Sequence, residues 1–132
     1  MKKIICFFST TRADYNLQYN IIDKIKKTKK YTYKLIISGT HFSKKYGNTE
    51  KEIYFDKIKV TKKILTNFDN YSIRNFFKNN SKIFFEFSMY LSKMSPDKIV
   101  LLGDRLETLL AAISAYTLNI PIIHIGGGEI TE

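Results

Sequence analysis

Two short apolar runs near the end of the chain each stop at glycine and are followed by an acidic residue. Residues 99–102 precede one glycine and Asp104, and residues 121–125 precede three glycines and Glu129. A short apolar run bounded by turn residues is typical of a strand buried on both faces, as in a parallel sheet. The carboxyl ends of such strands open into the crevice where these sheets bind ligands. We therefore expect Asp104 and Glu129 to lie near one cavity, where paired carboxylates suit proton transfer.

The remainder of the chain alternates between segments that predict strands and segments that predict helices. Apolar runs predict buried strands at residues 3–8, 33–38, 98–102 and 121–125, and a short outer strand within 57–65. Periodic apolar positions and capping residues predict helices at residues 14–27, 72–94 and 105–118, and a loop is expected over 40–51. This alternation predicts a single α/β domain over residues 1–132, with a doubly wound, mostly parallel, Rossmann-like sheet and right-handed crossovers.

Two of the predicted helices carry apolar residues that we expect to face the core. These are Leu17, Ile21 and Ile25 in the first helix, and Ile73, Phe76, Phe77, Phe84, Phe87 and Leu91 in the second. Each set recurs at about the helical period, which is typical of a helix that packs one face against a sheet. Cys6, the only cysteine, lies in the first predicted strand and is expected to be a small buried apolar residue without a disulfide partner.

The formal net charge of the chain is +10, and its lysines concentrate between residues 24 and 63. Such an excess indicates either a phosphate-rich partner or ordinary solvated lysines. The chain contains no nucleic-acid-binding motif, so we favour solvated lysines and expect no nucleic-acid partner. No apolar run approaches the ~20 residues of a membrane-spanning helix, and the short run near Met1 is not followed by a cleavage signal. We therefore expect no membrane partner and a cytoplasmic location.

Residues 9–16 follow the first predicted strand and combine hydroxyl side chains with Arg12 at the entry to a helix. Hydroxyls, an arginine and a helix N-terminus at a strand end suit a phosphate or diphosphate group. The alternative is an ordinary salt bridge between Arg12 and Asp14. Because Arg105 follows a second strand end, the two arginines together predict a convergent anion site.

Asp104 has both a structural and a functional interpretation. It precedes the helix predicted at 105–118, and aspartate commonly caps helices at this position. It also follows a buried strand and lies beside Arg105, whose charge would keep the carboxylate ionised. Glu129 follows three glycines, which leave the direction of its side chain less defined. Asp104 is therefore the stronger candidate for the proton-transferring group.

Five groups of residues occur in an order and spacing that resemble a known enzyme family. They are Thr11-Arg12-Ala13-Asp14-Tyr15, Ser38-Gly39-Thr40-His41 with Tyr46-Gly47-Asn48-Thr49, Gly103-Asp104-Arg105, Asn119-Ile120-Pro121-Ile122, and His124-Ile125 with Gly127-Gly128-Glu129. This set spans nearly the whole chain. It resembles the N-terminal domain of the hydrolysing UDP-N-acetylglucosamine 2-epimerases of sialic acid biosynthesis, and of their relatives acting on diacetamido sugars in legionaminic acid pathways. That family has two Rossmann-like domains in a GT-B-like arrangement, with the nucleotide sugar between them. The resemblance implies that this chain is the N-terminal part of a longer enzyme and that the second domain is absent from it.

The resemblance also implies a reaction and a set of site residues. The C2 proton of UDP-N-acetylglucosamine or a UDP-diacetamido sugar is removed, UDP leaves from C1, and addition of water to the glycal-like intermediate releases the free 2-epimer. The implied catalytic residues are Asp104 and Glu129, and the implied substrate-binding residues are Arg12, Asn16, Arg105 and His41. The chain has Gly126 where several members have glutamate, and Asn16 where many have serine. The scheme requires no metal and no cofactor, and the complete enzyme is expected to be a homo-oligomer.

His41 and His124 stand alone in the sequence and lack the spacing of metal ligands. We expect His124 to be a hydrogen-bonded strand residue and His41 to line the cleft, because it follows a strand end.

Two other functional interpretations stay open at this stage. One is a non-hydrolysing UDP-N-acetylglucosamine 2-epimerase or another GT-B-like nucleotide-sugar enzyme. Product analysis distinguishes such an epimerase, because it yields an epimerised UDP-sugar rather than a free sugar and UDP. The other is a non-catalytic, flavodoxin-like anion-binding domain, which would fold and bind its ligand without a second domain.

Overall fold

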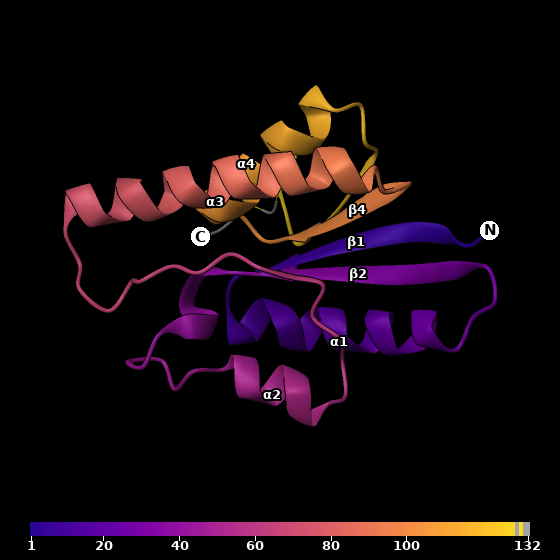
Figure 1. The fold of residues 1–132 in the computed structure, drawn as a ribbon, viewed down its shortest axis with the longest axis horizontal. Coiled ribbons are helices and arrows are strands. Elements are labelled where there is room, and N and C mark those ends of the chain that lie inside the picture. Colours follow the sequence, from indigo (N-terminus) through magenta and orange to yellow (C-terminus); the bar gives the residue numbers. More distant parts are fainter. Residues whose placement is uncertain (129, 131–132) are drawn as a thin grey trace.

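A computed structural model describes residues 1–128 and 130 of the chain. Its strands are β1 (Lys3–Ser9), β2 (Tyr31–Ile37), β3 (Lys62–Lys63), β4 (Lys98–Leu102) and β5 (Ile122–Ile125). In this part of the chain they form one five-stranded sheet in the order β3-β2-β1-β4-β5, and each pair of neighbours is parallel (Figure 1). The prediction of a doubly wound α/β fold with a parallel sheet is confirmed.

The strand order places a topological switch point between β1 and β4. From β1 the chain winds outward to β2 and β3, returns to the middle of the sheet at β4, and continues the other way to β5. The connections on the two sides of such a point diverge and leave a crevice at the carboxyl ends of the strands. The segments that follow β1, β2 and β4 therefore meet at this crevice.

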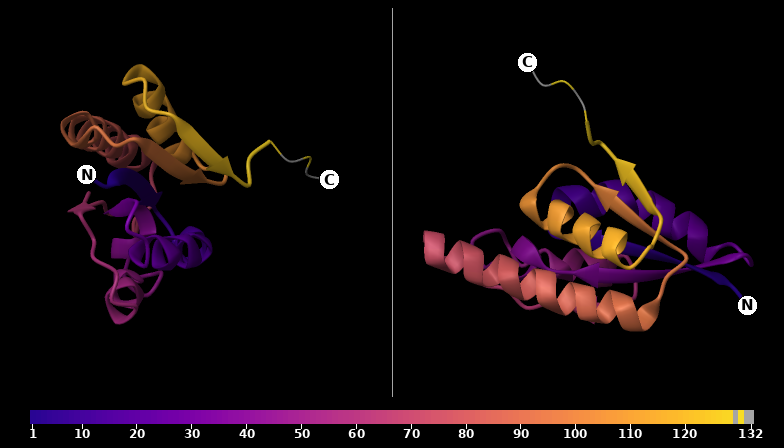
Figure 2. Two further views of the ribbon diagram at one scale, coloured as in Figure 1. Left: turned by 90° about the vertical axis from the view of Figure 1, so that its right-hand side faces the viewer. Right: turned by 90° about the horizontal axis from the view of Figure 1, so that it is seen from above.

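Helices cover both faces of the sheet. Helices α1 (Arg12–Lys26) and α2 (Glu50–Phe55) lie on one face, and α3 (Ile73–Met94) and α4 (Leu106–Thr117) lie on the other (Figures 1 and 2). No helix within residues 1–128 is long and apolar enough to cross a membrane.

Alternate side chains of β1 fill two separate cores. Phe7 packs with Tyr15 and Ile22 of α1, whereas Phe8 packs with Phe87 of α3, with 4.6 Å between their ring centroids. A strand buried on both faces needs apolar residues at every position. This requirement explains the uninterrupted apolar run at the start of the sequence, including the fully buried Cys6.

Helix α1 begins two residues before the predicted start because Thr11 caps it. The Thr11 hydroxyl accepts a hydrogen bond from the Asp14 backbone N–H at 3.2 Å, and the Asp14 carboxylate accepts one from the Thr11 backbone N–H. This reciprocal pair is a capping box, and it satisfies two backbone donors that a helix start otherwise leaves open.

The buried face of α1 differs from the predicted one. Ile21 and Ile25 are partly buried against the core as expected, but Leu17 is 64% exposed and the prediction for it is wrong. Gln18 is buried instead, because its amide donates a hydrogen bond to the Phe8 carbonyl at 3.0 Å.

The buried face of α3 also differs from the predicted one. Phe87 and Leu91 are buried as predicted, whereas Ile73, Phe77 and Phe84 are exposed, against the prediction. Their places in the core are taken by Asn79, Asn80 and Ile83. The first turns of α3 extend past the strands in Figure 1, so no sheet lies beneath them.

The segment expected to be a loop contains two short helical pieces. A 3₁₀ turn spans Gly39–Phe42, and α2 follows at Glu50–Phe55. The predicted outer strand is present but is only two residues long, as β3. These pieces fold the segment after β2 back over the strand ends, where it forms one wall of the crevice.

Candidate functional site

A pocket of about 340 Å³ lies at the switch point of the sheet. Its lining consists of Thr11, Arg12, Ala13, Thr40, Tyr46, Thr49 and Arg105. These residues come from the start of α1, from the segment after β2 and from the turn after β4. The structure thus brings together the two arginines that the sequence predicts to converge.

Arg12 occupies the first position of α1 and pairs with a residue that the sequence did not suggest. Its Nε lies 3.0 Å from Oε2 of Glu52 on α2, so the alternative of a salt bridge is realised, but with Glu52 and not with Asp14. The two side chains are 63% and 40% exposed, and an exposed pair of this kind contributes about 1 kcal/mol at most. An anionic ligand in the pocket can therefore compete with Glu52 for the guanidinium.

Arg105 is held in place by a buried carboxylate. Its Nη2 lies 3.2 Å from Oε1 of Glu107, whose side chain is only 5% exposed. Arg105 thus pairs with Glu107 and not with its neighbour Asp104. Sequence reasoning missed Glu107, although an acidic residue two positions after an arginine at a helix start was the available signal. Glu107 restrains the guanidinium at the edge of the pocket.

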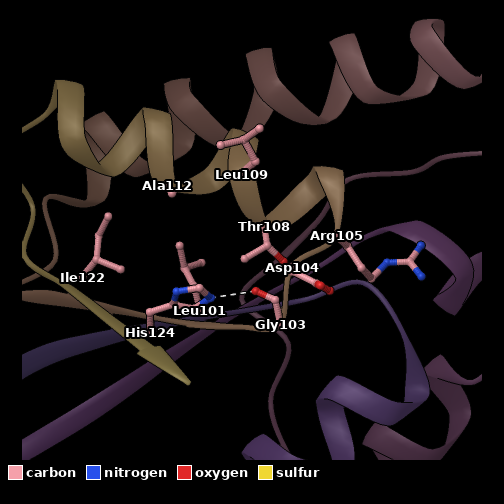
Figure 3. A pocket seen from close by; sticks show the side chains of 9 residues that line it. All are labelled: Leu101, Gly103, Asp104, Arg105, Thr108, Leu109, Ala112, Ile122 and His124. Atoms are coloured by element: carbon pink, nitrogen blue, oxygen red, sulfur yellow. Dashed lines mark hydrogen bonds between the residues drawn. The ribbon is translucent and has the colours of Figure 1, made fainter. Parts of the chain in front are cut away.

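Asp104 lies at a second pocket, of about 390 Å³, between α4 and strands β4 and β5 (Figure 3). Arg105 lines both pockets, and in Figure 3 its guanidinium points away from Leu109 and Ile122. Arg105 is the N-cap residue of α4, and no side chain caps this helix. The helix-capping interpretation of Asp104 is therefore wrong, and its exposed carboxylate has no capping role.

His124 fixes the turn that carries Asp104. Its Nε2 donates a hydrogen bond to the Gly103 carbonyl at 2.6 Å, which joins β5 to the end of β4. Gly103 has a φ of +79°, a conformation that residues with a Cβ rarely adopt. The expectation that His124 is a hydrogen-bonded strand residue is confirmed.

His41 is completely buried behind the first pocket and does not line it, contrary to the expectation from the sequence. Its Nε2 lies 2.8 Å from the Ser9 hydroxyl, and its Nδ1 lies 2.8 Å from the Thr49 hydroxyl. Ser9 in turn hydrogen-bonds to the Asp14 carboxylate. The chain of contacts Asp14–Ser9–His41–Thr49 thus connects the start of α1 to the wall of the pocket, and His41 acts on the pocket through Thr49.

The hydrogen bonds among Asp14, Ser9, His41 and Thr49 determine the tautomer of His41. The Ser9 hydroxyl donates its proton to Asp14, so it accepts from Nε2–H of His41, and Nδ1 then accepts from the Thr49 hydroxyl. Burial lowers the pKa of His41, against the opposing effect of the Asp14, Glu50 and Glu52 carboxylates, and so favours the neutral ring. The Thr49 oxygen therefore presents only lone pairs to the pocket.

A close backbone approach shapes the same wall. Gly39 has a φ of +64°, and a Cβ at this position would lie 2.5 Å from the Thr10 carbonyl oxygen. That carbonyl accepts a hydrogen bond from the Thr40 backbone N–H at 2.8 Å. Only glycine allows the segment after β2 to come this close to the end of β1.

Asn16 and Glu129 are the remaining predicted site residues. Asn16 is exposed on α1, one turn beyond Arg12, and does not line the first pocket. Glu129 lies outside the residues that the structure describes. Thr40, Tyr46 and Thr49 were not predicted as site residues, although they occur in the groups that carry the family resemblance. In the described residues, no group of three or more histidine, cysteine and acidic side chains could hold a metal ion.

The sequence of the chain was compared with protein families and with known proteins. The family model described as UDP-N-acetylglucosamine 2-epimerase matches residues 23–132. The chain belongs to the UDP-N-acetylglucosamine 2-epimerase family. It is 38% identical over 133 residues to the GDP/UDP-N,N′-diacetylbacillosamine 2-epimerase (hydrolyzing) of Campylobacter jejuni, which covers 98% of this chain and 34% of that protein. It is 33% identical to the UDP-N,N′-diacetylbacillosamine 2-epimerase (hydrolyzing) of Legionella pneumophila, with 98% and 34% covered.

Solved structures of the family share the fold. The UDP-N-acetylglucosamine 2-epimerase of Neisseria meningitidis, bound to UDP-N-acetylglucosamine, superposes with a TM-score of 0.76 at 23% identity, over 99% of this chain and 33% of that one. The chain described here thus spans about a third of the length of the relatives that it matches.

Proposed function

We propose that this chain forms the N-terminal, nucleotide-sugar-binding part of a hydrolysing UDP-sugar 2-epimerase. The observation that carries the proposal is the convergence of Arg12 and Arg105 on one pocket at the switch point of the sheet. Two guanidinium groups beside a helix N-terminus suit a diphosphate. The substrate is UDP-N-acetylglucosamine or a UDP-diacetamido sugar. The names of the Campylobacter and Legionella relatives support the diacetamido sugar.

In this proposal the residues of the first pocket bind the diphosphate, and Asp104 at the second pocket carries out proton transfer. Arg12 and Arg105 hold the diphosphate and stabilise the charge that develops as UDP leaves C1. Asp104, at the adjoining pocket, removes the C2 proton, and Glu129 is the second carboxylate. Water then adds to the glycal-like intermediate, and the free 2-epimer is released for nonulosonic acid biosynthesis.

Asn16 and His41 have supporting roles in this proposal. Asn16 lies one turn along α1 from Arg12 and, in this proposal, contacts the nucleotide beyond the diphosphate. His41 is a positioning residue, because it is buried and orients the Thr49 hydroxyl. Thr49 then accepts a hydrogen bond from a ligand hydroxyl or amide. We also propose a homo-oligomer in the cytoplasm, where a lone cysteine such as Cys6 stays reduced.

Binding of UDP to the 132-residue chain, followed by NMR chemical shifts and calorimetry, tests the proposed anion site. We expect shifts at the residues lining the first pocket. Arg12→Ala and Arg105→Ala should each weaken binding by about 1.5–3 kcal/mol, because each removes a charge-assisted contact. Arg74→Ala, an exposed arginine on α3, is the matched control and should leave binding unchanged. Equal affinity in all three variants would place the diphosphate elsewhere.

Measurement of turnover tests the role of Asp104. The assay uses a protein that includes this chain and has the full length of its relatives. Asp104→Asn is nearly isosteric, and we expect it to lower turnover by about a hundredfold or more with little loss of stability. Asp23→Asn is the control, because Asp23 is a partly exposed aspartate on α1 that pairs with Lys27. Product analysis should show UDP and a free 2-acetamido sugar. Full activity of Asp104→Asn would show that another group removes the proton.

A further inference from the structure

The addition of water in the proposed reaction needs a base that the lining of the first pocket does not supply. Water adds at C1, the carbon that UDP leaves, and therefore beside the pocket of Arg12 and Arg105. Asp104 already holds the C2 proton at this stage, and inversion at C2 takes a proton from a second carboxyl group. Among the described residues that line the first pocket there is no carboxylate and no imidazole. The proton of the water therefore needs an acceptor that is reached through the wall of the pocket.

The hydroxyl of Thr49, in that wall, does not cap its own helix. Thr49 is the N-cap residue of α2, a position where a threonine oxygen commonly accepts a hydrogen bond from a backbone N–H of the first turn and stabilises the helix. Thr49 makes no such bond. Its hydroxyl donates instead to Nδ1 of His41 at 2.8 Å, and its oxygen keeps lone pairs for the pocket. The direction of this hydroxyl indicates a use other than capping.

His41 has the hydrogen-bond partners of a general base. Its neutral ring accepts from Thr49 at Nδ1 and donates from Nε2–H to the Ser9 hydroxyl at 2.8 Å, and Ser9 donates to the Asp14 carboxylate. A hydroxyl, an imidazole and a carboxylate in series is an arrangement by which enzymes activate a hydroxyl or a water. In this chain Ser9 stands between the imidazole and the carboxylate. Because His41 is completely buried, a proton from the pocket reaches it through Thr49.

Charged groups on α1 and α2 stabilise a protonated His41 ring. Burial has the largest effect on the pKa of His41 and lowers it, whereas Asp14 on α1 and Glu50 and Glu52 on α2 raise it. Tyr15 packs edge-on against the ring, with 6.4 Å between the ring centroids. The ring is thus neutral before a proton is transferred, and three carboxylates reduce the cost of the positive charge that it then carries.

We propose that Thr49 and His41 together are the general base for the water that adds at C1. The C1=C2 electron pair of the intermediate takes up a proton at C2 from a carboxyl group of the site, and the water oxygen bonds to C1. The proton of the water passes to the Thr49 oxygen as the Thr49 proton passes to Nδ1 of His41. His41 returns this proton to solvent by the same route after the free 2-epimer has left. This proposal rests on the proposed function and assigns a step that it leaves open.

The two residues have different parts in this step. Thr49 is the catalytic residue, because its oxygen contacts the water, whereas His41 acts through Thr49. A single turnover by a protein that includes this chain and has the full length of its relatives tests the assignment. Chromatography with mass spectrometry quantifies UDP, the free 2-epimer and the unsaturated 2-acetamido glycal, which is lighter than the free sugar by one water.

Thr49→Val removes the hydroxyl and keeps the shape of the side chain. We expect UDP to be released, the free 2-epimer to form about a hundredfold or more slowly, and the glycal to accumulate. His41→Gln should give the same products, because the glutamine oxygen can accept the hydrogen bond of Thr49 but is too weak a base to take its proton. Circular dichroism checks that both variants are folded.

Two variants that keep the relay are the controls. Thr49→Ser retains a hydroxyl beside His41 and should form UDP and the free 2-epimer in equal amounts, as the parent protein does. Thr66→Val removes a hydroxyl that donates to the Gly39 carbonyl at 3.0 Å and is not part of the pocket lining, and it should also form them equally.

The ratio of the products separates a base from a residue that only positions the ligand. If Thr49→Val and His41→Gln lose UDP and the free 2-epimer to the same extent, or lose neither, the proposal is overturned. A parent protein that releases no UDP contradicts the proposed function instead, so the two failures are distinguished.

Discussion

The buried neutral state of His41 predicts a loss of stability as the pH falls. In the unfolded chain a histidine has a pKa near 6.5, whereas burial lowers the pKa of His41 in the folded chain. Below the unfolded value, the unfolded chain therefore binds a proton that the folded chain does not, and the free energy of unfolding decreases by up to about 1.4 kcal/mol per pH unit. The contribution of the neutral His41 ring to the free energy of unfolding is fully present above about pH 7.5. At about pH 5.5 the free energy of unfolding has decreased by up to about 1.4 kcal/mol, and the full decrease applies to a folded chain in which the ring stays neutral.

Urea unfolding at a series of pH values measures this effect in the parent chain and in His41→Gln. At neutral pH the variant should be less stable by about 1–3 kcal/mol, because the hydroxyls of Ser9 and Thr49 lose a partner in a buried site. As the pH falls from about 7.5 to about 5.5, the difference should narrow, because only the parent chain has the cost of keeping His41 neutral. The carboxylates titrate in both proteins and cancel in the difference.

His124→Gln is the control for the urea experiment, because it leaves His41 and its partners in place. Because His41 remains, the stability of this variant should still decrease between the two pH values. If the difference between the parent chain and His41→Gln does not change with pH, the inference that His41 is buried and neutral is refuted.

Three further predictions concern the strand ends and the core. Gly39→Ala should destabilise the chain more than Gly47→Ala in thermal unfolding, because both glycines have positive φ but only the Gly39 Cβ would collide with a neighbouring backbone. Burial raises the pKa of the Cys6 thiol to about 12, so iodoacetamide at mildly alkaline pH should alkylate it only after unfolding, and rapid native labelling would contradict its burial. Phe87→Ala should cost about 3–5 kcal/mol in urea unfolding, whereas Phe77→Ala at an exposed site should cost little; equal losses would mean that the α3 core face is misassigned.

The sequence predicts the α/β fold because its strands are buried on both faces. Continuous apolar runs such as residues 4–8 and 99–102 have few other stable arrangements in a chain that also contains amphipathic helices. Turn residues at the strand ends, hydroxyl residues before Arg12 and a glycine before Arg105, mark where the chain turns, and so the carboxyl edge of the sheet is predictable before any coordinates are known.

The sequence does not predict which face of α3 is buried, because aromatic and aliphatic residues occur on every side of that helix. The sheet beneath α3 selects Ile83, Phe87 and Leu91, whereas Phe77 and Phe85 are exposed. A helical pattern indicates a buried face only where polar residues mark the opposite one.

The partners of the charged residues also depend on the tertiary structure. The sequence suggests nearby pairs, Arg12 with Asp14 and Arg105 with Asp104, because it shows only which residues are adjacent. In the folded chain the capping box turns Asp14 inward toward Ser9, and α2 brings Glu52 to Arg12 from forty positions further along. The residue types that form the site are therefore determined by the sequence. Which of them touch is decided by packing, because burial and backbone geometry fix where each side chain can point.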